Sequence, residues 1–391
     1  MRKLSAIALF VGIGILTLVL AHCGTRVASN GFSSPTAPGL VHVTNGTTLG
    51  FYKTSGGYGF GTQGRSIFSL GNSWGSPPPF AQNPNTGAFY FGTNNSGAGN
   101  SVFYLNGLNG GFTFGTVGNS QIILESGGLS TGVALSQTTN LVYVADAVND
   151  VVTYLSATKP AYGIGGNMNN SVFAAPNGLG ASYINVAKNA VIVTETEVGT
   201  AYFMNASTGS PILAVGNSTS LPLVSATTPC NSANLVNEVQ VNPNTSQGFV
   251  LCGASVVYIN MLLSAPNYFM SGNLASSTIA TTGITTPTDF VYDSGDNTVI
   301  VVGGTKIISL DGQTGDLTNS LDVSTYGCGA GISLSGIAYS PLTKQIYVTD
   351  SVNSQVYVLG SSSFGLPTGE CATSVFSTGA DVSGPTKIGY F

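Results

Sequence analysis

Charged residues are scarce in this chain. They make up 6% of its 391 residues, with 10 Lys and Arg against 15 Asp and Glu, whereas an ordinary soluble domain has about 25%. So low a fraction argues against a coiled coil, a charge-rich disordered segment and most helical bundles. The few basic residues also occur singly, and nucleic-acid binding needs a basic stripe that meets the phosphates. We therefore expect no nucleic-acid partner.

Histidine is nearly absent as well. The chain has only His22 and His42, and it contains no CxxC pair. A serine or cysteine nucleophile needs a general base within hydrogen-bond reach, and in most such sites this base is histidine. A Cys/His metal centre needs several such ligands at short spacing. The sequence therefore predicts no catalytic residue, no metal site and no cofactor.

Long apolar runs are missing except at the start, where Leu4 to Leu20 follows Arg2 and Lys3. A positive stretch followed by an apolar run is typical of a secretory signal peptide. The run ends in Leu20-Ala21-His22-Cys23-Gly24, which resembles the bacterial lipobox, although His22 stands where that motif has Gly, Ala or Ser. We predict a signal peptide over 1–22, lipid on Cys23, and a flexible lipidated tether over 23–39. Cleavage at a nearby site without lipid, or an uncleaved anchor, are the alternatives.

Export follows from this N-terminus. No later stretch approaches the roughly 18 apolar residues that a membrane helix requires, so the rest of the chain is expected to be exported whole. The predicted location is the bacterial outer membrane, the periplasm or the cell surface, with the lipid anchor as the contact to the membrane. Removal of residues 1–22 leaves 8 basic against 15 acidic residues, a net charge of −7.

Four cysteines remain after Cys23, namely Cys230, Cys252, Cys328 and Cys371. An even number of cysteines in an exported protein indicates disulfides. Four cysteines allow three pairings. We expect neighbours in the sequence to pair, 230 with 252 and 328 with 371.

A repeat organises residues 40–391. Two short strands separated by a tight turn recur six times, and the second strands begin at residues 88, 141, 190, 248, 298 and 345 with the sequences AFYF, LVYV, AVIV, GFVL, TVIV and QIYV. A third strand follows each copy, whereas the fourth strands are too irregular to place. A period near 50 residues with Gly-, Asn- and Asp-rich turns is typical of the four-stranded blade of a β-propeller. The sequence thus predicts an all-β fold with a single propeller domain.

The two ends of this region complement each other. Residues 384–391 have the phase of a first strand with no second strand after it, and residues 48–52 and 66–70 look like later strands that lack a first one. Joining them into one blade would remove the open edges of the ring. We predict seven blades with the ring closed by strands from both termini, and six blades as the alternative.

Two copies, residues 141–152 and 345–356, resemble the NHL and YVTN repeats of extracytoplasmic propellers. The resemblance implies architecture and not a reaction, because these families include surface-layer, adhesion and scaffold proteins and a few lyases. Those lyases rely on metal-binding histidines without counterparts here. We expect a non-catalytic binding or scaffolding protein whose partner is a protein or a surface glycan. The alternative is a quinoprotein-like, cofactor-dependent oxidoreductase, although the repeat tryptophans of that family are absent.

Acidic side chains are predicted to gather on one face of the ring. Alignment of the first strands places Glu238, Asp289 and Lys387 at equivalent positions at the mouth of the central channel. The second strands end on the same face, with Asp146, Glu195 and Asp350. Funnels with a few converging polar groups are common ligand sites, so Glu238 and Asp289 are candidates for holding a cation or an amine. The competing interpretation is that Lys387 pairs with the carboxylates and that Asp146 and Asp350 bond to their own turns.

Overall fold

The computed structural model describes residues 39–54, 67–69, 80–82, 89–92, 100–106, 113–114, 121–125, 130–136, 139–156, 172–174, 181–187, 190–195, 199–206, 220–223, 230, 236–242, 247–260, 276–379 and 381–390. The predicted signal peptide, Cys23 and all but the last residue of the predicted tether lie outside these residues. Within the described residues, no helix is long and apolar enough to cross a membrane.

The strands of the described residues form seven antiparallel sheets. The first along the chain is β29(Lys387–Tyr390)-β1(Leu40–Thr44)-β2(Thr48–Lys53)-β3(Ile67–Ser69), and the second is β4(Phe80–Gln82)-β5(Phe89–Gly92)-β6(Asn100–Asn106)-β7(Thr113–Phe114), with β8(Gln121–Glu125) also paired to β6. The next two are β9(Ser130–Ser136)-β10(Leu141–Asp146)-β11(Val151–Ser156)-β12(Val172–Ala174) and β13(Ala181–Ala187)-β14(Ala190–Glu195)-β15(Thr200–Asn205)-β16(Ser220–Pro222).

The last three sheets follow the same order. They are β17(Val236–Asn242)-β18(Gln247–Cys252)-β19(Ser255–Asn260)-β20(Thr278–Ala280), β21(Asp289–Asp293)-β22(Thr298–Gly303)-β23(Lys306–Asp311)-β24(Leu317–Asp322) and β25(Leu334–Ser340)-β26(Gln345–Asp350)-β27(Gln355–Gly360)-β28(Val375–Ser377). Two short helices, η3(Val323–Tyr326) and α2(Cys371–Ser374), lie in the connections around the last sheet.

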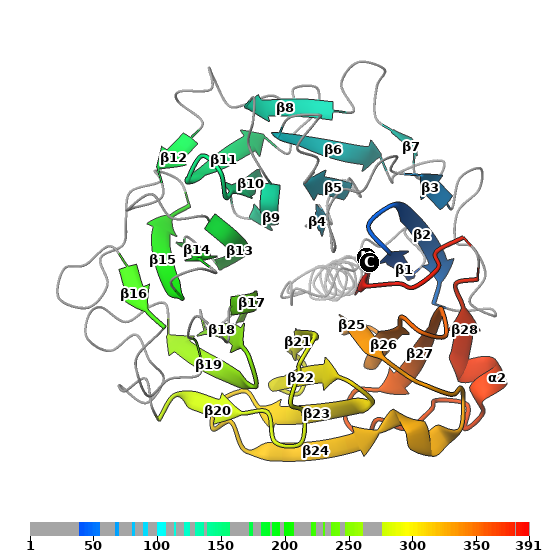
Figure 1. The fold of residues 1–391 in the computed structure, drawn as a ribbon. Coiled ribbons are helices and arrows are strands. Elements are labelled where there is room, and N and C mark those ends of the chain that lie inside the picture. Colours follow the sequence, from blue (N-terminus) through cyan, green and yellow to red (C-terminus); the bar gives the residue numbers. More distant parts are fainter. Residues whose placement is uncertain are drawn as a thin grey trace, which may run out of the picture.

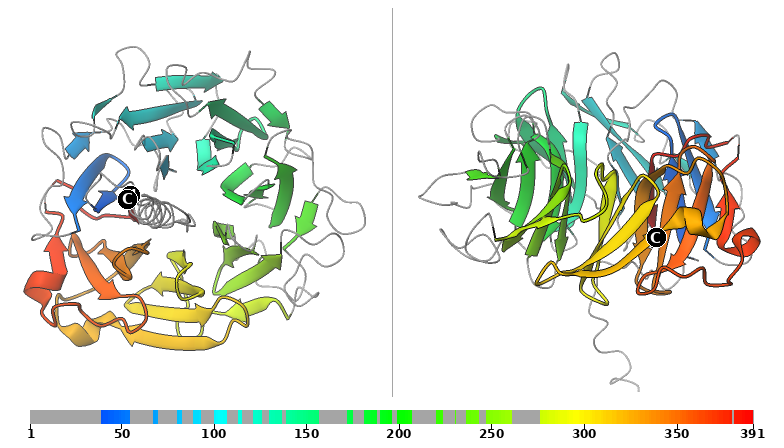
Figure 2. Two further views of the ribbon diagram at one scale, coloured as in Figure 1. Left: turned by 180° about the vertical axis from the view of Figure 1, so that it is seen from behind. Right: turned by 60° about the horizontal axis from the view of Figure 1, so that its bottom comes forward.

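The sheets stand radially around a central axis, and the first strand of each faces inward (Figures 1 and 2). Neighbouring first strands contact each other around the ring, as β9 with β13 and β25 with β29 do. This arrangement is a β-propeller, so the predicted all-β propeller fold is confirmed.

The ring closes through strands from both ends of the chain. β29 pairs with β1 over Val41–Thr44, and β1 pairs with β2. Residues 48–52 and 66–70, expected to be later strands, correspond to β2 and β3. The sequence pattern missed β1, which is the second strand of this sheet.

The hydrophobic core lies between neighbouring sheets. Second strands such as β18 are buried along their whole length because each is covered on both faces by adjacent sheets. Their sequences therefore read as continuous apolar runs and not as an alternating pattern. One core cluster joins Tyr143 of β10 to Val193 of β14, and another joins Phe249 of β18 to Val301 of β22. Packing of each sheet against its neighbours thus holds the propeller together, and the first strands line its central axis.

Candidate functional site

Three charged side chains from three different sheets meet at the central axis. The Lys387 ammonium forms an ion pair with Glu238 Oε2, and its Nζ lies 2.8 Å from Asp289 Oδ1. Glu238 lies in β17, Asp289 begins β21 and Lys387 begins β29. We call this group the axial triad. The sequence alignment placed these residues at equivalent positions, and the structure brings all three together.

Lys387 reaches two carboxylates that lie beyond its neighbouring strand β25. Strand β25 lies between β21 and β29 in the ring, and its residue at the equivalent position is Gly336. A Cβ atom at Gly336 would lie 3.0 Å from Lys387 Cα and 3.2 Å from Ile388 N. A side chain at position 336 would therefore crowd the backbone of β29, and glycine allows β29 to lie this close to β25.

The carboxylates of the axial triad make further hydrogen bonds. Asp289 Oδ2 accepts from the Ile337 backbone N–H of the next sheet at 3.1 Å, and its Oδ1 accepts from the Phe290 N–H at 2.9 Å. Glu238 Oε1 accepts from Gln240 Nε2 at 2.9 Å. Asp289 is 1% exposed, whereas the side chains of Lys387 and Glu238 are 16% and 17% exposed. The triad is therefore largely buried and has many internal partners.

Burial and the excess of negative charge shift the pKa values of the triad. Burial raises the pKa of Glu238, and the nearby Asp289 charge adds to this effect, while Lys387 opposes it. Burial alone would lower the pKa of Lys387, but the two carboxylates outweigh it and raise this pKa above its ordinary value. Because two carboxylates share one ammonium, Glu238 keeps its proton to a higher pH than an ordinary glutamic acid does.

The axial triad is occupied by its own cation. The Lys387 ammonium lies between the two carboxylates, where a ligand amine or metal ion would have to bind. Among the described residues, no group of three or more His, Cys, Asp or Glu is arranged to hold a metal ion. The geometry thus matches the interpretation in which Lys387 pairs with Glu238 and Asp289.

Asp146 and Asp350 direct their carboxylates into their own turns. Asp146 Oδ1 accepts from the N–H groups of Val148 and Asn149 at 3.0 and 3.1 Å, and its Oδ2 accepts from Asn149 Nδ2 at 2.9 Å. Asp350 makes the same three contacts with Val352 and Asn353. Both side chains are buried. They fix the turn between second and third strands and do not join the axial triad.

Glu195 ends β14, where its backbone pairs with Ala181 and Thr200. Its side chain lies outside the described part of the chain. The strand register places Glu195 at the same end of its sheet as Asp146 and Asp350, opposite the start of the first strand.

A recurring Ser or Thr hydroxyl at the start of the first strands was not predicted from the sequence. Thr288 Oγ1 donates to the Leu334 carbonyl at 2.9 Å, and Ser335 Oγ donates to the Pro385 carbonyl at 2.6 Å, each bond joining one sheet to the next. Both residues immediately precede an aligned axial position. Thr131 and Thr386 occupy the same place in two other sheets. This recurrent Ser or Thr is the signal that could have revealed them.

His42 lies in the seam between the first two sheets and not at the axis. Its ring is 4.3 Å from that of Phe80 and 4.5 Å from that of Phe89, and the residue is 2% exposed. Burial holds the pKa of His42 well below its ordinary value. A neutral imidazole packed edge-on against phenyl rings serves as a core side chain.

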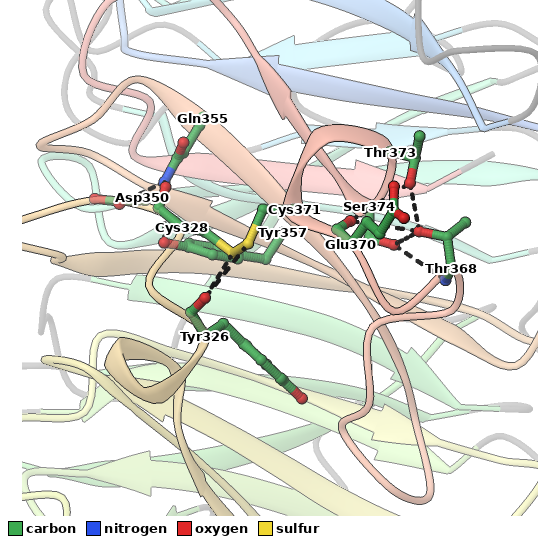
Figure 3. The surroundings of a disulfide bond; sticks show 10 residues. All are labelled: Tyr326, Cys328, Asp350, Gln355, Tyr357, Thr368, Glu370, Cys371, Thr373 and Ser374. Atoms are coloured by element: carbon green, nitrogen blue, oxygen red, sulfur yellow. Dashed lines mark hydrogen bonds between the residues drawn. A yellow bond between two sulfur atoms is a disulfide. The ribbon is translucent and has the colours of Figure 1, made fainter.

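Both predicted disulfides are present. Cys230 bonds to Cys252 and Cys328 bonds to Cys371. The first joins Cys230, six residues ahead of β17, to the end of β18, and the second joins the segment before β25 to the start of α2 (Figure 3). The pairing of sequence neighbours is therefore confirmed.

Comparisons with known proteins show the fold. No protein-family model and no curated protein match the chain. Among solved structures, it is similar to apo AztD from Citrobacter koseri, with a TM-score of 0.52, 12% identity and coverage of 90% of this chain and 98% of AztD. A second AztD structure from the same organism has a TM-score of 0.53 and 13% identity, and the match covers 90% of this chain and 97% of AztD. The propeller domain of Myceliophteria thermophila Cps50 (Swd1) has a TM-score of 0.50 and 9% identity, and the match covers 72% of this chain and 82% of that domain. These likenesses extend to the β-propeller fold and not to activity.

Proposed function

We propose that this chain is an exported, lipid-anchored propeller that binds or scaffolds other molecules without catalysis. The observation that carries the proposal is the internal use of its few charges. Lys387, Glu238 and Asp289 satisfy one another at the axis, and Asp146 and Asp350 stabilise turns. A catalytic carboxylate or amine must be able to reach a substrate atom, and these groups are committed to the fold.

Two observations support the proposal that the protein is exported. Two disulfides indicate an oxidising compartment. The lipobox-like sequence ending in Cys23 supports a lipid anchor. We propose that the protein resides at the bacterial outer membrane, in the periplasm or on the cell surface, that its lipid contacts the membrane, and that its partner is a protein or a surface glycan.

The number of blades and the type of repeat are part of what we propose. We take each of the seven sheets as one blade. The resemblance of residues 141–152 and 345–356 to NHL and YVTN repeats supports a relationship to extracytoplasmic propellers. Propellers of this kind present loops at both ends of their blades, and such loops are suited to recognition because a rigid scaffold positions them.

Lipid labelling tests the anchor. Bacteria expressing the full chain are grown with a labelled fatty acid, and we expect label on the wild type and none on Cys23→Ala. His22→Gly restores the usual lipobox residue and should increase the labelled fraction, whereas Glu370→Gln, an exposed control outside the motif, should not. Equal labelling of wild type and Cys23→Ala would exclude a lipid on Cys23.

The alternative from the sequence, a quinoprotein-like oxidoreductase, makes a different prediction. Such an enzyme would carry a chromophore and absorb visible light when purified in its native state. A featureless visible spectrum from protein isolated from its own cells would support the non-catalytic role, and a stoichiometric absorption band would overturn it.

A further inference from the structure

The two disulfides lie in different environments. Cys230 and Cys252 are both 0% exposed and belong to a hydrophobic cluster that joins the sheets of β13–β16 and β17–β20. Cys328 and Cys371 are each partly exposed, and Cys328 packs at the margin of the cluster around β25–β27. Thiol–disulfide exchange requires a thiolate to reach a sulfur atom. Access therefore distinguishes the two bonds.

The partly exposed disulfide holds a surface segment. Residues 327–333, which we call the clamped segment, connect η3 to β25. Their ends are fixed by hydrogen bonds: the Gly327 N–H donates to η3 at 3.2 Å and the Ser333 N–H donates to Asp350 Oδ1 at 3.1 Å. Between these ends, Gln355 Nε2 donates to the Cys328 carbonyl at 3.3 Å. Residues 329–331 are exposed, so the disulfide is the covalent tie of this stretch to α2 (Figure 3).

The clamped segment lies beside the turn that follows β26. A Cβ atom at Gly329 would lie 3.1 Å from Asn353 Nδ2 and 3.1 Å from Gln355 Nε2. The turn itself is held by Asp350, whose carboxylate accepts from Val352 and Asn353. These bonds do not depend on the disulfide. Loss of the disulfide would therefore loosen the clamped segment, above all its exposed residues 329–331, and leave the turn and its sheet in place.

We propose that Cys328–Cys371 is a redox-modifiable site that a dithiol reductant opens selectively, while Cys230–Cys252 stays closed. One thiolate of the reductant attacks a sulfur of the bond, forms a mixed disulfide and releases the other cysteine as a thiol. The second thiol of the reductant then attacks the reductant sulfur of the mixed disulfide and displaces the cysteine bound to it, so that both cysteines end as thiols and the reductant becomes a disulfide. Two electrons and two protons pass to the protein.

The reduced form has a polar partner already in position. The Tyr326 carbonyl oxygen lies 3.7 Å from Cys328 Sγ and 3.5 Å from Cys371 Sγ. A disulfide sulfur carries no hydrogen, but a thiol donates weakly, so either cysteine can donate to this carbonyl after reduction. Tyr326 itself is anchored because its hydroxyl donates to the Phe364 carbonyl. The site therefore accommodates both redox states.

Timed reduction of the native protein tests this site. The full chain is treated with dithiothreitol without denaturant, quenched with N-ethylmaleimide and mapped by mass spectrometry. We expect Cys328 and Cys371 to be labelled at least about ten-fold faster than Cys230 and Cys252. Equal rates, earlier labelling of Cys230 and Cys252, or resistance of both bonds until the protein is denatured would each overturn the proposal.

Hydrogen exchange tests the structural consequence with matched variants. Cys328→Ser/Cys371→Ser should raise exchange in residues 327–333 by at least about ten-fold and leave β17 and β18 unchanged. Cys230→Ser/Cys252→Ser is the comparison and should accelerate exchange in β17 and β18 instead. Gln355→Ala keeps the disulfide but loosens the clamped segment, and it should speed reduction several-fold. Unchanged exchange in 327–333 after selective reduction of the wild type would show that the disulfide does not hold this segment.

Discussion

Several buried carboxylates of this molecule form hydrogen bonds or ion pairs that stabilise the fold. Asp289 bonds across to the next sheet, Asp146 and Asp350 hold turns, and Glu238 shares a lysine. In a chain with 6% charged residues, few groups can make stability depend on pH, because linkage arises only from groups whose proton occupancy changes on folding. Glu238 and His42 have clear shifts, and they act in opposite directions.

Glu238→Gln should change the pH dependence of stability. The pKa of Glu238 is raised from 4.5 to about 8 by burial and by Asp289, so its ionised form is disfavoured in the folded state. A raised pKa contributes stability at low pH that is lost as the pH rises toward that value. Between about pH 5 and 8, urea unfolding should show the wild type losing up to about 5 kcal/mol relative to Glu238→Gln.

The exposed Glu370 provides the control for this experiment. Glu370→Gln should leave the pH profile of the wild type unchanged. His42 contributes a slope of opposite sign below its ordinary pKa, because its lowered pKa makes the folded state lose stability as the pH falls. Both variants retain His42, so its effect cancels in the comparison. Parallel profiles for wild type and Glu238→Gln would show that Glu238 is not the titrating group.

At the scale of the strands, the sequence predicted the inner part of each sheet well and the outer part poorly. Second strands such as β10 and β26 are covered on both faces, so their apolar runs stand out. Fourth strands such as β3, β20 and β28 have three residues each, and pairing on one edge imposes little pattern on so short a segment. Alignment could also place Lys387 at the axis, but it could not show that its side chain reaches Glu238 across the ring.

Gly336→Val should disturb the packing of β25 against β29. The new Cβ would meet backbone atoms of Lys387 and Ile388 at 3.0 and 3.2 Å, and backbone cannot move aside as a flexible side chain can. We expect a loss of about 1–3 kcal/mol in the free energy of unfolding, measured by urea denaturation.

Gly360→Val is the matched control for this substitution. Gly360 ends β27, and the nearest atom to its added Cβ is the Ser363 hydroxyl at 3.3 Å, which can rotate away. The expected loss is below about 1 kcal/mol. If both variants lost the same free energy, close approach of β29 would not be the reason for glycine at 336.

At the scale of the whole molecule, closure of the ring depends on one short strand. β29 pairs with β1, packs against β25 and supplies the lysine of the axial triad. Deleting residues 384–391 should therefore do more than shorten one sheet. It exposes the edge of β1, and an unpaired edge is a template for pairing with another chain.

We expect this deletion to lower the melting temperature and to cause self-association, both measured on the purified protein by calorimetry and by light scattering after size exclusion. Lys387→Met is the companion variant, because it removes the ammonium but keeps the strand. It should lower the melting temperature and remain monomeric. A truncated protein that stayed monomeric with an unchanged melting temperature would show that the ring does not need β29.

The pairing of β1 on both sides also determines how the domain responds to tension. β1 is bonded to β29 along one edge and to β2 along the other, and the chain enters it from residue 39. A pull on that entry along the strand axis loads both rows of hydrogen bonds in shear, so that they must break together and not one after another. The seam that joins the two ends of the chain is therefore also where the propeller resists mechanical force.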